Sequence, residues 1–359
     1  MGIKMRVYRH LPLDARAWLF EKKLMDRHWP SWYEETYRSV LNQAFDTFLT
    51  SEERSDKKLM RELTNDIVKC WFRYQALPYE YFLYDMRHCD DDKRATFLTD
   101  VVKDQTCVQY INLEVFNKEV KDKYAFFQIM KPFFGRKVFQ VNNLTDRGEF
   151  VKFAMDVKSL FCKLSKGSRG NGAFAEEVSS EEDAERLFLR LTTSIDDVWV
   201  VEERIHQSEE MAQWNESSVN TVRIPSFITQ SGFKVICPAY RTGRKGSVVD
   251  NASQGSVLAG IDIVSGTLIT DGVDEFGHTF KEHPDSGLVF KGWQIPRWKE
   301  LLETAEQAHR TIPHHKYIGW DFALTDKGWV LIEGNWGQMI GQYATKVGVK
   351  DLFMKYISE

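Results

Sequence analysis

Residues 317–335 constrain the fold of this chain more than any other segment. The segment is mostly apolar but carries Asp321, Glu333 and Asn335. Two strands are expected, over 317–325 and 329–335. The three residues 326–328 between them form a loop that ends in glycine, the residue type suited to a positive φ at that position. The segment therefore predicts a β-hairpin.

The register of this hairpin brings acids together. If Thr325 pairs with Trp329, Asp321 lies opposite Glu333, and Asn335 shares the face of Glu333 because side chains alternate along a strand. Directly opposed carboxylates destabilise a sheet, so such an apolar hairpin needs a compensating cation. Three oxygen ligands on one face suit Mg²⁺. The alternative is a solvent-facing hairpin with scattered acids.

Composition limits the class of protein. The chain has 359 residues and 43% hydrophobic content, enough for a large core in two or three domains, and a net charge of −4 gives no global field that attracts nucleic acid. Five widely spaced cysteines without a CxxC motif predict reduced thiols. No segment has the length and apolarity of a membrane span or of a secretion signal. We expect a cytoplasmic protein.

The N-terminal part is expected to be mostly helical. A capping box at 31–34 precedes apolar residues at helical spacing over 37–48, and a second such pattern over 59–72 is expected to end at Pro78. The acidic run 90–92 is interpreted as a turn or helix start, in preference to a metal site.

The pattern changes near residue 141, where short β-like runs begin to alternate with helices. Helices are expected after the cap at 180–183 and over 296–310, the latter beginning at Pro296. Ser231-Gly232 and Ser265-Gly266 are expected hairpin turns. The expected strands are 159–164, 198–205, 221–229, 233–240, 257–264 and 267–270.

A glycine-rich basic loop follows the strand at 159–164. Its glycines permit backbone N–H groups to point inward and bind phosphate oxygens. Its spacing matches neither a Walker A motif nor a dinucleotide-binding fingerprint, and a flexible solvated loop is the alternative. The residues concerned are Lys163, Lys166, Gly167, Arg169, Gly170 and Gly172.

The basic loop and the acidic hairpin downstream of it are the two halves expected of a nucleotide-triphosphate site. Between them, the strand at 198–205 ends in two acids. Its end is able to present backbone groups to an adenine edge, although taken alone it is only a strand end.

With these parts in this order, the chain resembles ATP-grasp proteins, and more closely the ATP-grasp family associated with sugar transfer and surface-polysaccharide gene clusters. The resemblance runs from about Asp122 to Gly337. The matching segments are 122–124, the Lys163 strand with its loop, 202–205, 218–223, 241–243, 249–252, 283–287 with 296–298, 319–321 and 333–335.

This resemblance implies an α+β fold in which two lobes clamp ATP. It implies a small lobe with the lysines and the lid loop over 121–205, and a large lobe with the metal hairpin over 206–359. The helical pattern assigns residues 1–120 to a mostly helical N-terminal region, whereas many relatives have an α/β domain there.

The resemblance also implies roles for individual residues. Phosphate contacts fall to Lys123, Lys163, Lys166, Gly167, Gly170 and Gly172; the adenine hinge to Glu202, Glu203, Arg204 and Ile205; Mg²⁺ to Asp321, Glu333 and Asn335; and substrate to Asn220, Asp250, Asn251 and His283. The alternative for Asp250-Asn251 is a turn between strands, and for His283 a hydrogen bond that orders its loop.

One position departs from the relatives that form peptides. D-alanine–D-alanine ligases carry an arginine two residues before the metal aspartate, where this chain has Gly319. Arg223 and Arg241 are our candidates for that missing arginine, and with Lys163 they are the expected catalytic residues.

The implied activity is ATP-dependent carboxylate–amine ligation through an acyl phosphate, with ATP and Mg²⁺, on a sugar, uronic acid or amino-acid-type substrate in surface-polysaccharide or related biosynthesis. A kinase of the same fold is the first alternative. A nucleotide-binding subunit without turnover, serving a glycosyltransferase, is the second. Small-molecule partners and a monomer or homodimer are expected.

Other conspicuous residues are interpreted as structural. A metal site at His314-His315 is disfavoured because adjacent side chains in a strand point to opposite faces. Trp293 and Trp298 are assigned to core packing, in preference to sugar stacking. Cys162, beside Lys163, is expected to be buried and inert.

Overall fold

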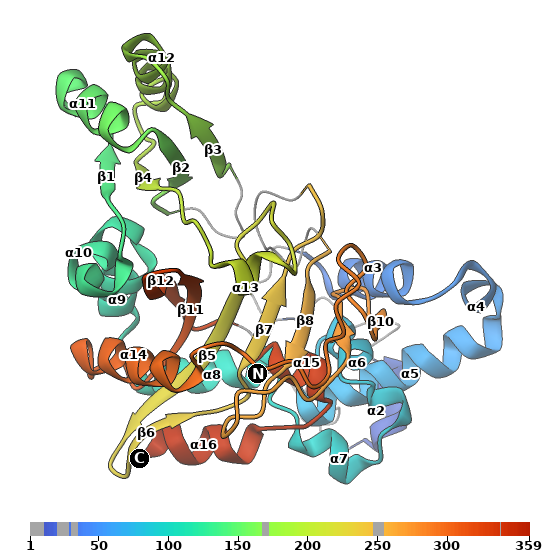
Figure 1. Cartoon of the computed structure of the whole chain (residues 1–359). Coiled ribbons are helices and arrows are strands. Elements are labelled where there is room, and N and C mark those ends of the chain that lie inside the picture. Colours follow the sequence, from blue (N-terminus) through green and yellow to red (C-terminus); the bar gives the residue numbers. More distant parts are fainter. Residues whose placement is uncertain (1–10, 20–28, 30–34, 167–171, 247–254, 338) are drawn as a thin grey trace. The chain divides into compact units, whose positions relative to one another are not determined.

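The computed structural model of the chain (Figure 1) describes residues 11–19, 29, 35–166, 172–246, 255–337 and 339–359. It confirms an α+β protein whose N-terminal region is mostly helical. The chain forms two compact units. The first comprises Met1–Thr106, Phe276–His278 and Lys346–Met354, and the second comprises Cys107–Glu275, Thr279–Thr345 and Lys355–Glu359.

The first unit is built of helices. They are α2 (Leu13–Leu19), α3 (Tyr37–Phe48), α4 (Ser51–Ser55), α5 (Lys57–Tyr74), α6 (Pro78–Leu83), the 3₁₀ turn η3 (Met86–His88) and α7 (Asp91–Thr96), with α8 (Asp100–Tyr110) beginning in it. The expected helix over 37–48 is confirmed as α3, and its N-cap is Thr36. The expected capping box at 31–34 lies outside the described residues.

Two further boundaries follow from capping. Helix α5 begins after Asp56, whose carboxylate accepts hydrogen bonds from two backbone N–H groups, and it ends at Tyr74 because Gln75 turns left-handed at φ 54°. The expected stop at Pro78 is therefore wrong. Pro78 is the first residue of α6, where a missing N–H costs nothing. The run at 90–92 starts α7 with Asp90 as its N-cap, as expected.

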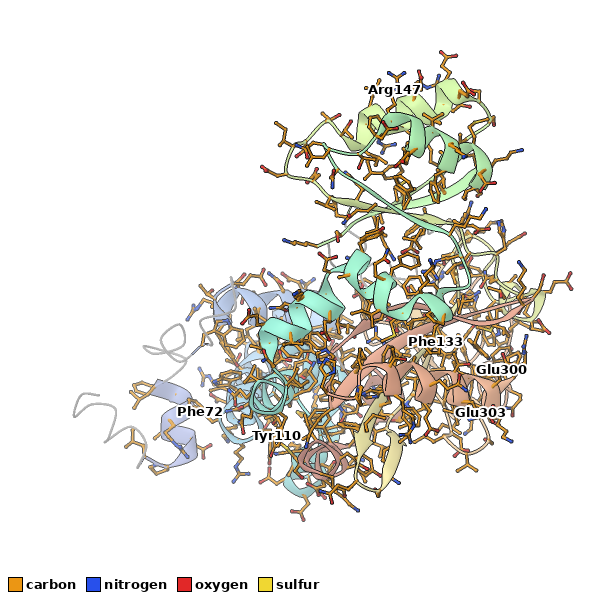
Figure 2. All side chains as sticks on the ribbon, turned by 90° about the vertical axis from the view of Figure 1, so that its left-hand side faces the viewer. Phe72, Tyr110, Phe133, Arg147, Glu300 and Glu303 are labelled. Carbon is orange, nitrogen blue, oxygen red and sulfur yellow. The ribbon has the colours of Figure 1, made fainter. Side chains whose placement is uncertain are left out.

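The second unit contains two antiparallel sheets. The strands of the smaller sheet are β1 (Val138–Val141), β2 (Ser159–Leu164), β3 (Phe174–Glu177) and β4 (Trp199–Glu203), in the order β1-β4-β2-β3. Helices α11 (Arg147–Val157) and α12 (Glu181–Leu191) pack together over it (Figure 1). Arg147, labelled in Figure 2, pairs with Glu185 across these two helices. Their shared core contains Val141, Phe150, Leu160, Cys162, Leu187 and Val201.

The larger sheet has the order β10-β9-β8-β7-β5-β11-β12, with β6 paired to β5. Its strands are β5 (Thr221–Thr229), β6 (Gly232–Val235), β7 (Ala239–Thr242), β8 (Val257–Gly260), β9 (Gly272–Val273), β10 (Thr279–Phe280), β11 (Tyr317–Thr325) and β12 (Gly328–Asn335).

Helices complete this unit and cover the larger sheet. Helix α10 packs on β12, α14 packs on β5, and the two helices contact each other; Figure 2 labels Phe133 of α10 and Glu300 and Glu303 of α14. The remaining bounds in this unit are α9 (Leu113–Phe116), the π-helical turn η4 (Asn117–Lys121), α10 (Lys123–Phe134), α13 (Glu209–Ala212), α14 (Trp298–Thr311) and α15 (Gly341–Thr345). Helix α16 (Lys350–Ser358) is divided between the two units. No helix in the described part combines the length and apolarity needed to cross a bilayer.

The expected strands at 159–164 and 221–229 have the observed bounds, whereas others differ. The single strand expected over 233–240 is two strands, β6 and β7, because the chain turns at Cys237 with φ 47°. The strand expected over 257–264 ends at Gly260. Residues 267–270 form only isolated bridges. Helix α14 begins at Trp298, after Arg297 at φ 53°, and not at Pro296.

The capping box of α12 gives the first prediction. The Ser180 hydroxyl accepts from the Asp183 N–H at 3.2 Å, and the Asp183 carboxylate accepts from the Ser180 N–H at 2.9 Å. Replacing Ser180 with alanine removes one half of this exchange and should lower the free energy of unfolding by about 1 kcal/mol. Urea titration measures the loss.

Thr311→Ala is the matched control, because the Thr311 hydroxyl donates to a carbonyl in the last turn of α14 and caps no N-terminus. A loss for Ser180→Ala no larger than that for Thr311→Ala would contradict the assigned role of the cap.

Candidate functional site

In the hairpin of β11 and β12, Asp321 and Glu333 are paired as expected, but the register that pairs them differs from the expected one. Thr325 pairs with Gly328, so the loop has two residues and the expected pairing with Trp329 is wrong by one position. A register shift after Asp321 inserts Ile332 as an extra residue, and Asp321 lies opposite Glu333 again. A β-bulge of this kind re-aims side chains and is common beside functional sites. Gly328 has the expected positive φ, at 133°.

Asp321 is fully buried and is neutralised by two arginines. Arg223, its partner on β5, forms a two-pronged ion pair in which Nη2 lies 2.8 Å from Oδ2 and Nε contacts Oδ1. Arg241 of β7 adds a contact of 3.2 Å from Nη2 to Oδ2, and its Nε donates to Thr221 at 2.9 Å. Burial opposes ionisation of Asp321, but the two guanidiniums outweigh it and hold the pKa of this carboxyl below its usual value.

Glu333 is the carboxylate without such compensation. Burial and the neighbouring Asp321 charge raise the pKa of Glu333, against the opposing effect of Lys163, Arg223 and Arg241. Asn335 lies two residues further along the same strand, 3.5 Å from Glu333 through its Nδ2 atom. Its Oδ1 accepts the Gly337 N–H at 2.8 Å, which fixes the amide oxygen.

This donor set fits a divalent cation. Two carboxylates and one amide oxygen on one face of a hairpin are the hard ligands that Mg²⁺ takes, and few of them are needed when phosphate oxygens complete the shell. The raised pKa of Glu333 marks the position where additional positive charge stabilises the pair. Asp321, Glu333 and Asn335 are therefore the residues that would hold Mg²⁺.

Gly319 and Gly337 lie close to Asn335 and Arg223. A Cβ atom at Gly319 would lie 3.3 Å from Asn335 Oδ1 and 3.5 Å from Arg223 Cδ. A Cβ atom at Gly337 would lie 2.7 Å from Asn335 Oδ1 and 3.1 Å from Arg223 Nη1. A side chain at Gly337 would therefore displace the Asn335 amide or the Arg223 guanidinium, whereas the contact of Gly319 with Arg223 is an ordinary one.

Lys163 belongs to a second buried ion network, around Glu202. Lys163 Nζ lies 2.5 Å from Glu202 Oε1, and Arg136 contacts Oε2 through Nε at 2.9 Å and Nη2 at 2.7 Å. Burial opposes ionisation of Glu202, but Arg136 and Lys163 together lower its pKa below the usual 4.5. The Glu202 side chain is therefore committed to two cations.

Lys123 lies at the start of α10, beside the end of β2. Asp122 caps the helix by accepting from the N–H groups of Tyr124 and Ala125 at 3.1 Å. Lys123 Nζ donates to the carbonyls of Leu164 and Ser165 at 3.1 and 3.3 Å. Burial and the nearby Lys163 lower the pKa of Lys123, while Glu333 and Glu202 act against this.

The cations and the acids therefore meet within the second unit. Lys123 and Lys163 both interact electrostatically with Glu333. Arg136 connects the two sheets directly, because it binds Glu202 of β4 and also donates to the carbonyl of Leu331 in β12 at 2.7 Å. The two halves inferred from sequence share one electrostatic environment.

Of the other residues expected at the adenine hinge, Glu203 ends β4, and Arg204 and Ile205 follow it. Glu203 Oε2 accepts the Lys137 N–H at 3.1 Å, and Arg204 lies 3.6 Å from Glu177. The Arg204 N–H donates to the Ser159 carbonyl at 2.9 Å, which joins this segment to the smaller sheet. Ile205 is half-buried beyond the end of the strand.

Two of the expected substrate residues lie in the protein interior. Asn220 is fully buried, and its Nδ2 lies 2.8 to 2.9 Å from Gln207 Oε1 and the carbonyls of Met211 and Asn215. His283 lies 3.0 Å from the Gly243 carbonyl through Nε2, so it fastens the 283–287 turn to the segment after β7. Both residues hold loops in place.

Other predicted residues are less constrained or not described. Lys166 is exposed, and Gly172 has φ 77°. Gly167, Arg169, Gly170, Asp250 and Asn251 lie outside the described residues. Cys162 is buried, and its burial raises the pKa of the thiol to about 12, in agreement with an inert residue.

Sequence reasoning missed Arg136. This arginine follows Gly135, which ends α10 at φ 59° and has no room for a Cβ because Val330 would lie 2.6 Å away. The sequence did contain a signal for this residue, since a basic residue stands between a glycine that ends a helix and the strand that follows. Nothing in the sequence pairs that residue with Glu202, which lies 66 positions away.

The family comparison identifies a known group. The profile of the sugar-transfer associated ATP-grasp family matches residues 160–355, more than half of the chain. Among curated proteins, no sequence matches this chain significantly.

Solved structures give weaker likenesses. D-alanine–D-alanine ligase from Bacillus anthracis is 10% identical with a TM-score of 0.42, over 72% of this chain and 74% of that chain. D-cycloserine synthetase DcsG is 9% identical with a TM-score of 0.43, over 80% and 85%. ATP-grasp ligase PsnB, complexed with minimal precursor, is 13% identical with a TM-score of 0.40, over 87% and 78%. At these TM-scores the likenesses carry no further conclusion.

The Glu202 network predicts a large effect on stability. Glu202→Gln removes the negative charge that pairs with both Arg136 and Lys163 and leaves these two buried cations uncompensated. It should therefore lower the free energy of unfolding at neutral pH by about 3–5 kcal/mol. Because the folded-state pKa of Glu202 lies below 4.5, its contribution is present above that pH and is lost as the pH falls through the folded-state pKa. The variant should therefore lose less stability on acidification than the wild type, as urea titrations across this range measure.

Glu177→Gln on β3 is the control, since Glu177 pairs only at the surface, with Ser159 at 2.6 Å and Arg204 at 3.6 Å. It should cost less than about 1 kcal/mol. Equal effects of the two substitutions would disprove the importance of the buried network.

Proposed function

Because the chain belongs to the sugar-transfer associated ATP-grasp family, we propose that it is an ATP-dependent carboxylate–amine ligase. The observation that carries this proposal is the joining of the two ion networks. Lys163, bound to Glu202, also acts on the charge of Glu333, and Arg136 connects the sheets that carry these acids. A bound nucleoside triphosphate requires cationic side chains for its phosphates and acidic ligands for its metal ion, close to each other.

Two lobes would hold the nucleotide. We assign the smaller sheet to the lobe over 121–205, the larger sheet to the lobe over 206–359 and the helical region to 1–120. Lys123 and Lys163 would neutralise the phosphate oxygens. The segment from Glu202 to Ile205 would offer its backbone groups to adenine, since the Glu202 side chain is occupied by Arg136 and Lys163. Lys166 and the glycines that follow it would form the lid.

Asp321, Glu333 and Asn335 would hold Mg²⁺, which supplies positive charge to the phosphate oxygens when bound. The protein's part is to keep the three oxygens on one face. The bulge after Asp321 does this for Glu333, and the Gly337 N–H does it for Asn335.

The proposed chemistry has two steps. A substrate carboxylate oxygen attacks the γ-phosphorus of ATP, the bond from phosphorus to the bridging oxygen breaks, and ADP leaves with that electron pair. The amine then attacks the acyl carbon of the resulting acyl phosphate, inorganic phosphate leaves, and the amine loses one proton. No oxidant or reductant is needed, so positioning and charge neutralisation account for the catalysis.

Arg223 and Arg241 are the cations closest to the metal ligands on the larger sheet. Both contact Asp321, which holds their guanidiniums in place, and we propose that they stabilise the negative charge that develops on the acyl oxygen. Fixed donors of this kind act most strongly where water is excluded. Lys163 would assist on the phosphate side.

The family description supports a substrate connected with sugar transfer. We propose a carboxylate or amine borne by a sugar, a uronic acid or an amino acid, in surface-polysaccharide or related biosynthesis. Asn220 and His283 would act as positioning residues, because each orders a loop, while Asp250 and Asn251 would contact the substrate.

The test is a product analysis. The chain is incubated with Mg²⁺-ATP and a panel of uronic acids, amino acids and nucleotide-linked sugars, with amines and with hydroxylamine, which traps acyl phosphates. We expect ADP release and a product whose mass equals acid plus amine minus water. Glu333→Gln should abolish this turnover while leaving the fold intact, because it removes a metal carboxylate without changing shape.

Asp326→Asn is the matched control, as Asp326 is an exposed acid in the loop of the same hairpin. It should retain activity. A phosphorylated product that persists in the presence of amine would instead establish a kinase. ADP release that survives Glu333→Gln would refute the metal assignment.

Lys163→Ala tests the phosphate site separately. Loss of one charge-assisted contact with phosphate costs about 1.5–3 kcal/mol, which is roughly a 10- to 100-fold loss of ATP affinity. Isothermal titration with a non-hydrolysable ATP analogue measures it, and thermal unfolding checks that the variant is folded.

Lys137→Ala provides the comparison, because Lys137 is an exposed lysine that pairs with Asp156 near the same sheet. Its affinity should match that of the wild type. Unchanged affinity in Lys163→Ala would exclude Lys163 from the phosphate site.

A further inference from the structure

Glu119, His314 and His315 form a cluster outside the proposed nucleotide site. Glu119 lies in η4, and the two histidines lie in the turn between α14 and β11. His314 Nε2 lies 2.6 Å and His315 Nε2 lies 3.1 Å from the same atom, Glu119 Oε2. One donor atom from each residue lies within 4.8 Å of the other two.

The geometric argument against a metal at His314-His315 fails because these residues precede β11 and do not belong to it. In the turn both rings point the same way, with their centroids 4.3 Å apart. The alternation of side chains that separates neighbours in a strand does not apply there.

The cluster is held in place before any ligand arrives. His315 is 1% exposed, and the Phe116 ring packs edge-on against it at 5.3 Å. Its backbone carbonyl accepts from His309 Nε2 at 2.7 Å, and His309 is itself fixed by Ser226 at 2.8 Å. The ring contact with Phe116 and the hydrogen bond to the His315 backbone therefore hold this residue beside Glu119.

We propose that Glu119, His314 and His315 bind Zn²⁺. Two imidazole nitrogens and one carboxylate are a known zinc donor set, with one coordination position left open. Zinc bonds of roughly 2.0–2.2 Å at tetrahedral angles place donor atoms roughly 3.3 Å apart. The two histidine nitrogens lie 2.6 and 3.1 Å from Glu119 Oε2, so these two separations would have to widen slightly. His314, which is half exposed, has the freedom to make it.

The position of the cluster gives the ion a structural role. Glu119 is in the turn that leads directly into Asp122 and Lys123, and His315 comes just before β11, the strand of Asp321. A zinc ion would tie these two segments together. Its nitrogen ligands distinguish this site from the all-oxygen set of the hairpin, which suits Mg²⁺.

The experiment measures Zn²⁺ binding to the full-length chain in excess Mg²⁺ and without nucleotide, by competition with a chromophoric chelator. We expect one Zn²⁺ per chain. His314→Ala and Glu119→Ala should each weaken it by more than about 100-fold, since a lost ligand costs more than a lost outer partner. Co²⁺ should give visible absorption bands of a nitrogen-containing tetrahedral site that are absent in both variants.

Two controls isolate the site. His88→Ala removes an exposed histidine that also lies 2.6 Å from a carboxylate, that of Asp85, and should leave binding unchanged. Glu333→Gln should also retain Zn²⁺, which separates this proposal from the function of the hairpin. Zn²⁺ affinity that is absent, or equal in wild type and His314→Ala, would overturn the proposal.

Discussion

The burial of carboxylates with matched cations is the constraint on which the second unit depends. Asp321 and Glu202 are both buried. An isolated ionised carboxylate is too costly to bury, so each must be paired and hydrogen-bonded. Arg223 and Arg241 do this for Asp321, while Arg136 and Lys163 do it for Glu202. These pairs determine which strands are neighbours, because β5 must lie beside β11 and β4 beside β2.

The same constraint explains how structure leads to function. Burial and the neighbouring Asp321 charge raise the pKa of Glu333, and Lys163, Arg223 and Arg241 offset this rise only in part. Asp321 and Glu202 each have their own cations, whereas the charge of Glu333 is only partly compensated. The position beside Glu333 is therefore suited to a further cation. We propose that Mg²⁺ with a triphosphate fills this need. The protein thus keeps its fold stable without ligand, while the final charge is supplied by the substrate complex.

The sequence was most informative where local rules act. Alternation and turn chemistry predicted β2, β5 and the acidic hairpin, and the capping motif predicted α12. The pairing of Asp321 with Glu333 was predicted for a partly wrong reason, because the shorter loop and the bulge at Ile332 cancel each other. A bulge depends on neighbouring strands, which a single hairpin sequence does not reveal.

Contacts between distant segments were beyond the reach of sequence patterns. The three members of the Arg136 network come from the end of α10, from β2 and from β4, and no periodicity relates them. Arg223 shows the same limit. The resemblance offered it as a candidate for an expected arginine, but its ion pair with Asp321 becomes visible only when β5 and β11 lie side by side.

The two proposed metal sites lie at different positions along strand β11 and offer different ligand types. The turn before it offers imidazole nitrogens beside Glu119, and its middle offers the Asp321 carboxylate among arginines. Borderline-soft Zn²⁺ prefers the first environment, and hard Mg²⁺ the second. The positive charge of Arg223 and Arg241 disfavours tight binding of a cation by Asp321 alone, so under our proposal Mg²⁺ would bind together with phosphate oxygens of ATP. The proposed Zn²⁺ would stay bound before the start of β11, and the proposed Mg²⁺ would arrive with the substrate at the middle of the strand. The two sites are therefore compatible within the same sheet.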